Sequence, residues 1–382
     1  MSKMANTNLS DAKNAKNDEF YTQYADIQKE VNAYIEYDPN VFKDKTILLP
    51  CDDPEWSNFT KFFAQNFENF GIRKLISTSY AYDKKRVKGP YQLSFFEEHS
   101  PQFDKSKTKS HGKIFMLTRD SNKSGKIDID DLEWKYLKGD GDFRSEEVTK
   151  LRDEADIIVT NPPFSLFKEF LEWLVTANKK FLIIGNKNCV TYKEVFPLIQ
   201  NNQLWTGNGF SNGNAFFRIP DTEARDYANG VYDATTGLVK FRNVSWFTNL
   251  EHGRRHQPLQ LMTMADNIRY SKHKEVREKG YPHYDNYDAI EVPYTDAIPS
   301  DYNGVMGVPV SFLDKFCPEQ FEILGMCENL DLYGLKTRVY TAQECRDRYF
   351  ELFGKKGVYD LNAAGVVNGT KVYQRILIRT KR

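Results

Sequence analysis

The sequence predicts an α/β fold built on a parallel β-sheet, and three observations lead to this prediction. Helical and strand patterns alternate through the first half of the chain, as in a parallel sheet whose strands are joined by crossover helices. The strand-like segments are short, continuous apolar runs, which is typical of strands buried on both faces. At 382 residues the chain exceeds one average domain, so two domains are expected.

The elements of the first half are predicted from their apolar spacing. A helix is expected over 24–35, because Ile27, Val31 and Ile35 recur at helical spacing. The other expected elements are strands over 46–50, 74–77, 156–160 and 181–185 and helices over 58–67 and 167–174. Residues 83–126 are polar and rich in lysine, which indicates an insertion or a long hairpin.

The second half of the chain has a different pattern. Beyond about residue 200, short β-like runs separated by Gly, Asn and Pro replace the alternation. A basic segment begins near Leu250, and we expect a domain boundary there. The chain is therefore divided into a flexible leader over 1–16, a first domain over 17–250 and a second region over 251–382.

Composition limits the class of protein. Hydrophobic residues make up 40% and charged residues 28%, as in ordinary globular proteins, and no apolar run approaches the roughly 18 residues that cross a bilayer. The five cysteines form no CxxC pair and are odd in number, which favours reduced thiols in the cytoplasm over a disulfide framework or a zinc site. We therefore expect a cytoplasmic protein without a membrane segment or a metal.

The strongest chemical signal is the tetrapeptide from Asn161 to Phe164, which directly follows a predicted buried strand. Ligands of open α/β sheets bind at the carboxyl ends of the strands. The Asn161 side-chain oxygen and the Pro162 carbonyl could accept hydrogen bonds from an aromatic amine and localise its lone pair as charge develops. Pro163 adds no competing N–H, and Phe164 offers a face on which an extruded base can stack. A purely structural alternative is a strand-to-helix turn with Asn as N-cap and Pro at the first helical position.

A second polar turn follows the first predicted strand. The segment CDDPEWSNF begins at Cys51 and places Asp52 and Asp53 at the end of that strand. Carboxylates in this position suit a cationic amino-acid group. A simple turn in which Ser57 or Asn58 caps the next helix explains the same residues.

Together these motifs resemble one family. The segments KNDEFYTQ from Lys16, CDDPEWSNF, GDGDF from Gly139, TNPPF, FLIIGN, SNGNAFFRIP, SWFTNL, MGVPVSFLDKF and RILIR are similar to the EcoRI-type adenine-specific DNA methyltransferases. The resemblance covers nearly the whole chain after the leader. It implies a Rossmann-like methyltransferase sheet with helices on both faces, followed by a C-terminal mixed α/β region that recognises the DNA target.

The resemblance also implies an activity and its partners. The enzyme would transfer a methyl group from S-adenosylmethionine to the N6 amino group of a flipped adenine in double-stranded DNA, as a restriction–modification or an orphan modification enzyme. Residues 17–250 would form the catalytic domain and 251–382 the target-recognition region. The motif order resembles the γ arrangement. A cognate restriction endonuclease stays open as a further partner.

Site residues follow from the same resemblance. Phe20, Tyr21 and Thr22 would contact the methionine end of the cofactor, and Asp52, Asp53 and Ser57 would line the same pocket. Asp142 would lie near the cofactor's adenine ring. In one departure, the second predicted strand ends in Ser-Thr-Ser-Tyr (77–80) without the acid that many methyltransferases use for the ribose hydroxyls.

Basic runs indicate where DNA phosphates would bind. Net charge is zero, but residues 240–279 hold nine Lys or Arg against four Asp or Glu, and the last twelve residues hold five basic side chains and no acid. The candidate DNA-binding residues are Arg254, Arg255, Lys272 and Lys274. Solvated surface faces would explain the same runs equally well.

Other functions stay open at this point. An NPP-aromatic turn also suits methylation of RNA adenine or of a protein glutamine amide. Residues 120–131 match a calcium-binding EF-hand loop, which would suit a DNA-binding or calcium-binding module without catalysis. The residues before that loop have a strand pattern, however, so we expect a polar hairpin turn.

Overall fold

The computed structural model describes residues 20–54, 56–81, 83, 97, 100–210, 213–218, 230–328, 330–357 and 365–381. The predicted leader over 1–16 and most of the segment 83–99 lie outside these residues. Contacts within the chain define two compact units. The first holds the described residues up to Val195 together with Leu204–His252, and the second holds Phe196–Gln203 and the described residues from Gly253 onward.

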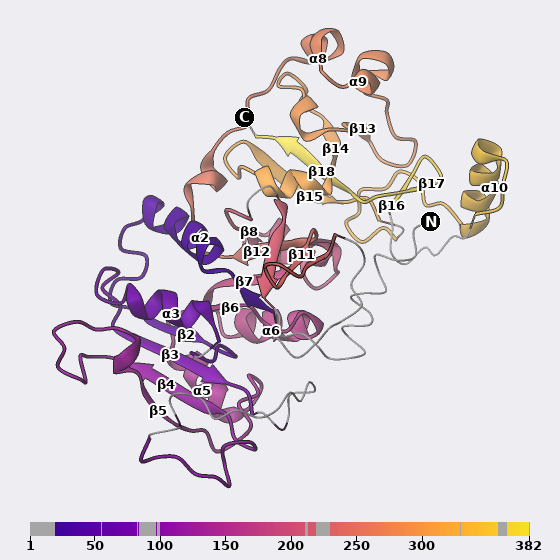
Figure 1. The fold of residues 1–382 in the computed structure, drawn as a ribbon. Helices are drawn as coiled ribbons and strands as arrows, with labels where there is room; N and C mark the ends of the chain where they lie inside the picture. The colour runs from indigo at the N-terminus through magenta and orange to yellow at the C-terminus, as the bar shows by residue number, and fades with distance from the viewer. Residues whose placement is uncertain are drawn as a thin grey trace. The chain divides into compact units, whose positions relative to one another are not determined.

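An eight-stranded mixed sheet forms the centre of the first unit, and Figure 1 shows its strands β5 to β7 in succession. In spatial order the strands are β5 (Glu133–Tyr136), β4 (Lys113–Leu117), β3 (Lys74–Ser79), β2 (Thr46–Leu49), β6 (Ile157–Thr160), β7 (Lys180–Asn186), β12 (Val244–Thr248) and β8 (Trp205–Thr206). The four central strands β3, β2, β6 and β7 are parallel, and the outer four pair antiparallel. The four predicted strands and their parallel arrangement are therefore confirmed.

The apolar runs are buried as their composition predicts. Every residue of β2 and β6 is buried, as expected for central parallel strands covered on both faces of the sheet. The predicted first helix is confirmed as α2 (Tyr24–Tyr37), whose Ile27 and Val31 are fully buried. The next helix is α3 (Asn58–Gln65), and Ser57 caps it by accepting a hydrogen bond from the Phe59 N–H.

The segment that resembles an EF-hand loop connects β4 to β5, which pair antiparallel. The strand before it and the polar hairpin turn are thus confirmed, and the flanking helices of an EF-hand are replaced by these strands. Its carboxylates serve the turn itself. Asp120 accepts from the Ser124 and Gly125 N–H groups, and Asp131 accepts from the Ser121, Asn122 and Asp128 N–H groups.

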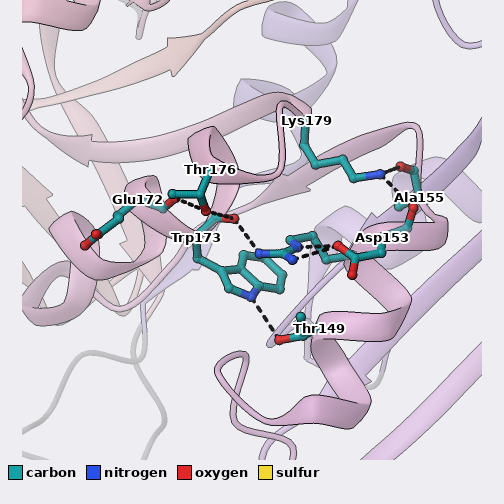
Figure 2. A network of polar contacts seen from close by, with 8 residues as sticks. Thr149, Asp153, Ala155, Glu172, Trp173, Thr176 and Lys179 are labelled. Carbon is teal, nitrogen blue, oxygen red and sulfur yellow. Dashed lines mark hydrogen bonds and ion pairs between the residues drawn. The ribbon is translucent and has the colours of Figure 1, made fainter.

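Two helices flank β6 and are joined by a polar network (Figure 2). They are α5 (Glu146–Glu154), which precedes β6, and α6 (Phe167–Thr176), which follows it. The Trp173 indole N–H donates to the Thr149 hydroxyl at 3.2 Å, and the Lys179 ammonium donates to the Asp153 and Ala155 carbonyls at 2.7 and 2.8 Å. These bonds join α5 to α6 and hold the residues that lead into β6.

A second, four-stranded sheet belongs to the same unit. Its order is β1 (Tyr21–Thr22), β9 (Ala215–Arg218), β11 (Leu238–Phe241) and β10 (Tyr232–Asp233), all antiparallel. The start of the described chain therefore pairs with a strand from the far end of the unit. In Figure 1 the short indigo strand lies among the pink and red strands of this sheet.

The second unit combines sheets and helices. Its four-stranded sheet is β13 (Ala289–Glu291), β14 (Val305–Pro309), β18 (Arg375–Thr380) and β15 (Phe321–Met326), and its hairpin is β16 (Gly365–Val367) with β17 (Thr370–Val372). Its helices are α7 (Phe196–Gln200), α8 (Met264–Tyr270), α9 (Lys274–Lys279) and α10 (Ala342–Phe353). Within the described ranges, no helix of the chain is long and apolar enough to cross a membrane.

Candidate active site

The two polar turns meet at the carboxyl ends of neighbouring parallel strands. Strand β2 pairs with β6 in a register that joins Leu48 to Ile158, so the residues after both strands lie at one edge of the sheet. There the Thr160 hydroxyl lies 2.7 Å from the Pro50 carbonyl oxygen and 2.6 Å from Asp52 Oδ2. The sheet thus links the CDDPEW turn directly to the residue before Asn161.

Asp52 is a buried carboxyl group surrounded by hydroxyls. Its side chain is 6% exposed, and Ser57 donates to its Oδ1 at 2.7 Å. Burial raises the pKa of Asp52 to about 7. Because the Thr160 hydroxyl has one proton for two acceptors, a protonated Asp52 can donate back to Thr160 while Thr160 donates to the Pro50 carbonyl. Burial therefore favours the neutral acid and outweighs the hydrogen bonds from Ser57 and Thr160, which favour the carboxylate.

This burial has a testable consequence for stability. Between about pH 4 and pH 7 the folded protein keeps a proton on Asp52 that the unfolded chain has lost, so this group makes the protein less stable as the pH rises through that window. We expect Asp52→Asn to remove this pH-dependent loss of stability. The unfolding free energy of the variant minus that of the wild type should therefore be larger at pH 8 than at pH 4. Urea unfolding at both pH values measures this. A difference between the two proteins that does not change with pH would contradict it.

The two polar atoms of the Asn161 side chain differ in their hydrogen bonding among the described residues. Its amide nitrogen donates to the Phe20 carbonyl oxygen at 2.8 Å. Its carbonyl oxygen Oδ1 is buried and has no hydrogen-bond partner among the described residues. A buried acceptor without a donor costs about 1–3 kcal/mol, so a ligand amine placed here would gain a hydrogen bond that the protein alone lacks. The side chain does not cap the following 3₁₀ turn Phe164–Leu166, whose N-cap is Pro163.

Phe164 belongs to a cluster of four phenylalanines. Its ring stacks against Phe20 with centroids 5.8 Å apart and planes at 25°, and it meets Phe217 and Phe241 at 6.3 and 6.2 Å. Phe164 itself is only partly buried. Pro162 is buried beside it, and Pro163 precedes the short 3₁₀ turn Phe164–Leu166.

The residues predicted for the methionine end of a cofactor are assembled around β1. The Thr22 carbonyl accepts from the Asn58 side chain at 2.7 Å, which attaches β1 to the start of α3. The Thr22 hydroxyl is buried without a hydrogen-bond partner among the described residues. Tyr21 stacks on Trp56 at 6.3 Å. Asp53 is partly exposed, in contrast to the buried Asp52.

Asp142 lies at the same sheet edge with a cation beside it. Both of its oxygens accept from Arg144, at 2.9 and 2.7 Å, and these hydrogen bonds lower the pKa of Asp142. The neighbouring Gly141 has φ of +83° and packs against the Ser79 carbonyl, where a side chain would clash. The GDGDF turn is thereby held against the end of β3, near Tyr80, whose pKa is raised by burial and by Asp140 and Asp142.

The predicted DNA-binding residues belong to the second unit and differ in exposure. Arg255 is 6% exposed and donates to Asn202 at 3.0 Å, so the expectation that it faces a phosphate does not fit its placement. Arg254 is partly exposed. Lys272 and Lys274 are well exposed and pair with Asp296 and Glu278, respectively. Surface ion pairs of this kind contribute little to stability, so each lysine can leave its carboxylate and bind a phosphate instead.

Three structural partners of the site were not predicted from the sequence. Thr160 holds Asp52, and Phe217 and Phe241 support Phe164. The alternating pattern of AFFR (215–218) marks a strand, but the pairing of that strand with β1 has no local signal. Within the described ranges, no group of three or more His, Cys, Asp or Glu side chains is placed to hold a metal ion.

Comparison with known proteins identifies the family. The family model described as "Adenine-specific methyltransferase EcoRI" matches residues 8–381. The chain belongs to this family. Since the match spans both units, the chain is an adenine-specific DNA methyltransferase, and its reaction requires a methyl donor. No solved structure matches the chain.

Curated relatives of this EcoRI-type methyltransferase cover most of its length. Type II methyltransferase M.EcoRI of Escherichia coli is 42% identical over 329 residues, which is 85% of this chain and 90% of the relative. Type II methyltransferase M.MpnI of Mycoplasma pneumoniae is 35% identical over 88% of this chain and 91% of its own. Type II methyltransferase M.MgeORF184P of Mycoplasma genitalium is 33% identical over 97% and 98%.

Proposed function

We propose that this methyltransferase transfers a methyl group from S-adenosylmethionine to the N6 amino group of an adenine flipped out of double-stranded DNA. The observation that carries the proposal is Asn161, whose buried Oδ1 has no donor while its amide nitrogen is fixed by the Phe20 carbonyl. The central parallel strands, with α2 and α3 packed on one set of their side chains and α5 and α6 joined to each other, support a Rossmann-like methyltransferase sheet with helices on both faces as the fold.

The residues of the catalytic turn orient the target amine. Asn161 Oδ1 and the Pro162 carbonyl accept its two N–H groups, which localises the nitrogen lone pair as positive charge develops. The bond to Phe20 sets the amide so that its oxygen, and not its nitrogen, is available. Phe164 stacks on the flipped base, and its packing on Phe20 fixes the ring plane. The proton can leave to solvent after transfer.

The other end of the site fits a methyl donor with an amino-acid moiety. When bound, S-adenosylmethionine supplies an electrophilic methyl group on a sulfonium. Asp53 would pair with its ammonium, and the unpartnered Thr22 hydroxyl would bond its carboxylate end. Asp52 and Ser57 would shape the pocket without binding the ammonium. Ser57 caps α3, and its hydroxyl donates a hydrogen bond to Asp52. Asp142, which is held by Arg144, would lie near the adenine ring of the cofactor.

DNA would be recognised by the residues from 251 to 382, a mixed α/β region. Arg254, Lys272 and Lys274 supply cations for phosphates there, and the basic last strand β18 belongs to the same unit. The Type II names of the relatives also suggest a cognate restriction endonuclease as a functional partner.

Labelled cofactor tests the proposal directly. Tritiated S-adenosylmethionine incubated with the enzyme and with DNA, RNA or protein should label DNA, and hydrolysis should yield N6-methyladenine. Label in RNA or in protein glutamine would instead support the two rival substrates that share an NPP-aromatic turn. Absence of label in all three would refute the proposal.

Arg254 and Arg255 should respond differently to the same substitution. If Arg254 contacts a phosphate, Arg254→Gln should flatten the dependence of log affinity on log salt by about 0.9. Arg255→Gln should leave that slope unchanged and lower the unfolding temperature, because the Arg255 guanidinium is buried against Asn202 and Phe316. A salt titration of duplex binding and a melting curve separate the two. Equal slopes for wild type and Arg254→Gln would contradict the phosphate contact.

A further inference from the structure

The small sheet β1-β9-β11-β10 has two chemically different faces. Along β9, Ala215 and Phe217 are buried while Phe216 and Arg218 are exposed. Phe217 and Phe241 on the inner face pack against Phe20 and Phe164 of the site. The strands that build the catalytic turn from one side therefore present a second surface on the other.

That outer face, defined here as Tyr21, Phe216, Arg218 and Lys240, combines aromatic rings with cations. In the sheet register, Tyr21 is the partner of Arg218, and Phe216 is the partner of Lys240. Phe216 is 39% exposed, and Lys240 Nζ lies 5.8 Å from its ring centroid. Next to Tyr21 the Trp56 ring continues the surface and is 52% exposed.

Among the described residues, neither of the two cations of this face, Arg218 and Lys240, forms an ion pair with an acid. Asp233 lies on the edge strand β10, but its carboxylate accepts from the Thr235 N–H and the Thr236 hydroxyl of its own turn. Two cations beside exposed aromatic rings complement a polyanion whose bases are available for stacking.

We propose that the outer face of the small sheet binds the DNA strand next to the flipped adenine. Arg218 and Lys240 contact phosphates. Phe216 stacks on the adjacent base, which loses a stacking partner when the target adenine flips out of the duplex. The placement is argued from the chain, because Phe20, whose carbonyl accepts from Asn161, directly precedes Tyr21 of this face. This inference rests on the proposed function, since it uses the flipped adenine to place the DNA.

Single-stranded DNA is the suitable probe, because it offers unpaired bases whatever the recognition sequence is. Binding of the full chain to a fluorescein-labelled single-stranded oligonucleotide is measured by anisotropy over a range of salt concentrations. The double variant Arg218→Gln/Lys240→Gln should flatten the salt dependence by up to about 1.4, since each single-strand contact contributes about 0.7. Phe216→Ala should weaken binding about fivefold or more at an unchanged slope.

A matched control separates local contacts from net charge. Lys126→Gln/Lys135→Gln removes the same two charges from the β4–β5 hairpin and should change neither affinity nor slope. If Phe216→Ala lowers the unfolding temperature, Phe216→Leu keeps the apolar packing and removes only the ring. Wild-type affinity and slope in both the charge and the ring variants would overturn the proposal. Labelling of DNA by the wild-type enzyme is scored separately, so failure of the proposed function and failure of this surface give different results.

Discussion

Asn161→Ala is expected to lower the turnover number by about 100- to 1,000-fold, which corresponds to a loss of about 2.7–4 kcal/mol of transition-state stabilisation. The change removes the unpartnered Oδ1 acceptor and also the donor to the Phe20 carbonyl. The first loss acts on the developing charge of the amine, and the second loosens the attachment of β1. Single-turnover methylation under saturating DNA and cofactor measures the effect on chemistry. Turnover close to wild type would remove Asn161 from the mechanism.

Asn161→Asp serves as the matched control for the two losses. It keeps an acceptor toward the amine and loses the N–H that bonds the Phe20 carbonyl. If the acceptor matters most, this variant should retain more turnover than Asn161→Ala while binding the cofactor more weakly than the wild type. If both variants lose turnover equally, the contact with Phe20 is the dominant role.

Asp53→Asn should weaken S-adenosylmethionine binding by about 10- to 150-fold, because a hydrogen bond to a charged group contributes about 1.5–3 kcal/mol. Asp53 is the more accessible of the two neighbouring carboxylates and is therefore the one that can face an ammonium. Calorimetric titration with the cofactor gives the affinity. The unfolding temperature of Asp53→Asn without cofactor should be near that of the wild type.

The neighbouring Asp52→Asn provides the comparison. This side chain is buried and bonded to Ser57 and Thr160, so its replacement should act mainly on stability and its pH dependence. A larger loss of cofactor affinity in Asp52→Asn than in Asp53→Asn would assign the contact with the ammonium to Asp52 and not to Asp53.

Local patterns predicted most of the central sheet. The apolar runs before Pro50 and Asn161 are short, continuous and bounded by polar turns, which indicates buried strands. Strands β2 and β6 confirm them. The strand before the EF-hand-like loop was predicted for the same reason. The tetrapeptide from Asn161 to Phe164 could be found because its residue types suit both a tight turn and an acceptor site.

Contacts between distant segments could not be predicted in this way. The bond from Asn161 to Phe20 spans 141 positions, and the pairing of Tyr21 with Arg218 spans more. Neither has a spacing rule, since both depend on how the sheet is assembled. The burial of Arg255 was missed for a related reason, because Arg254 beside it has the same charge and only tertiary packing against Phe316 distinguishes them.

The pairing of β1 with β9 sets the earliest time at which the catalytic turn can be completed during synthesis. Residues 20–22 leave the ribosome early, but their partner strand is made about 200 residues later, which takes at least about 10–40 s at 5–20 residues per second. Until then the Phe20 carbonyl cannot be held beside Asn161 by the small sheet. A nascent chain that already contains the complete NPPF turn should therefore lack methyltransferase activity, so partial translation products would not modify DNA.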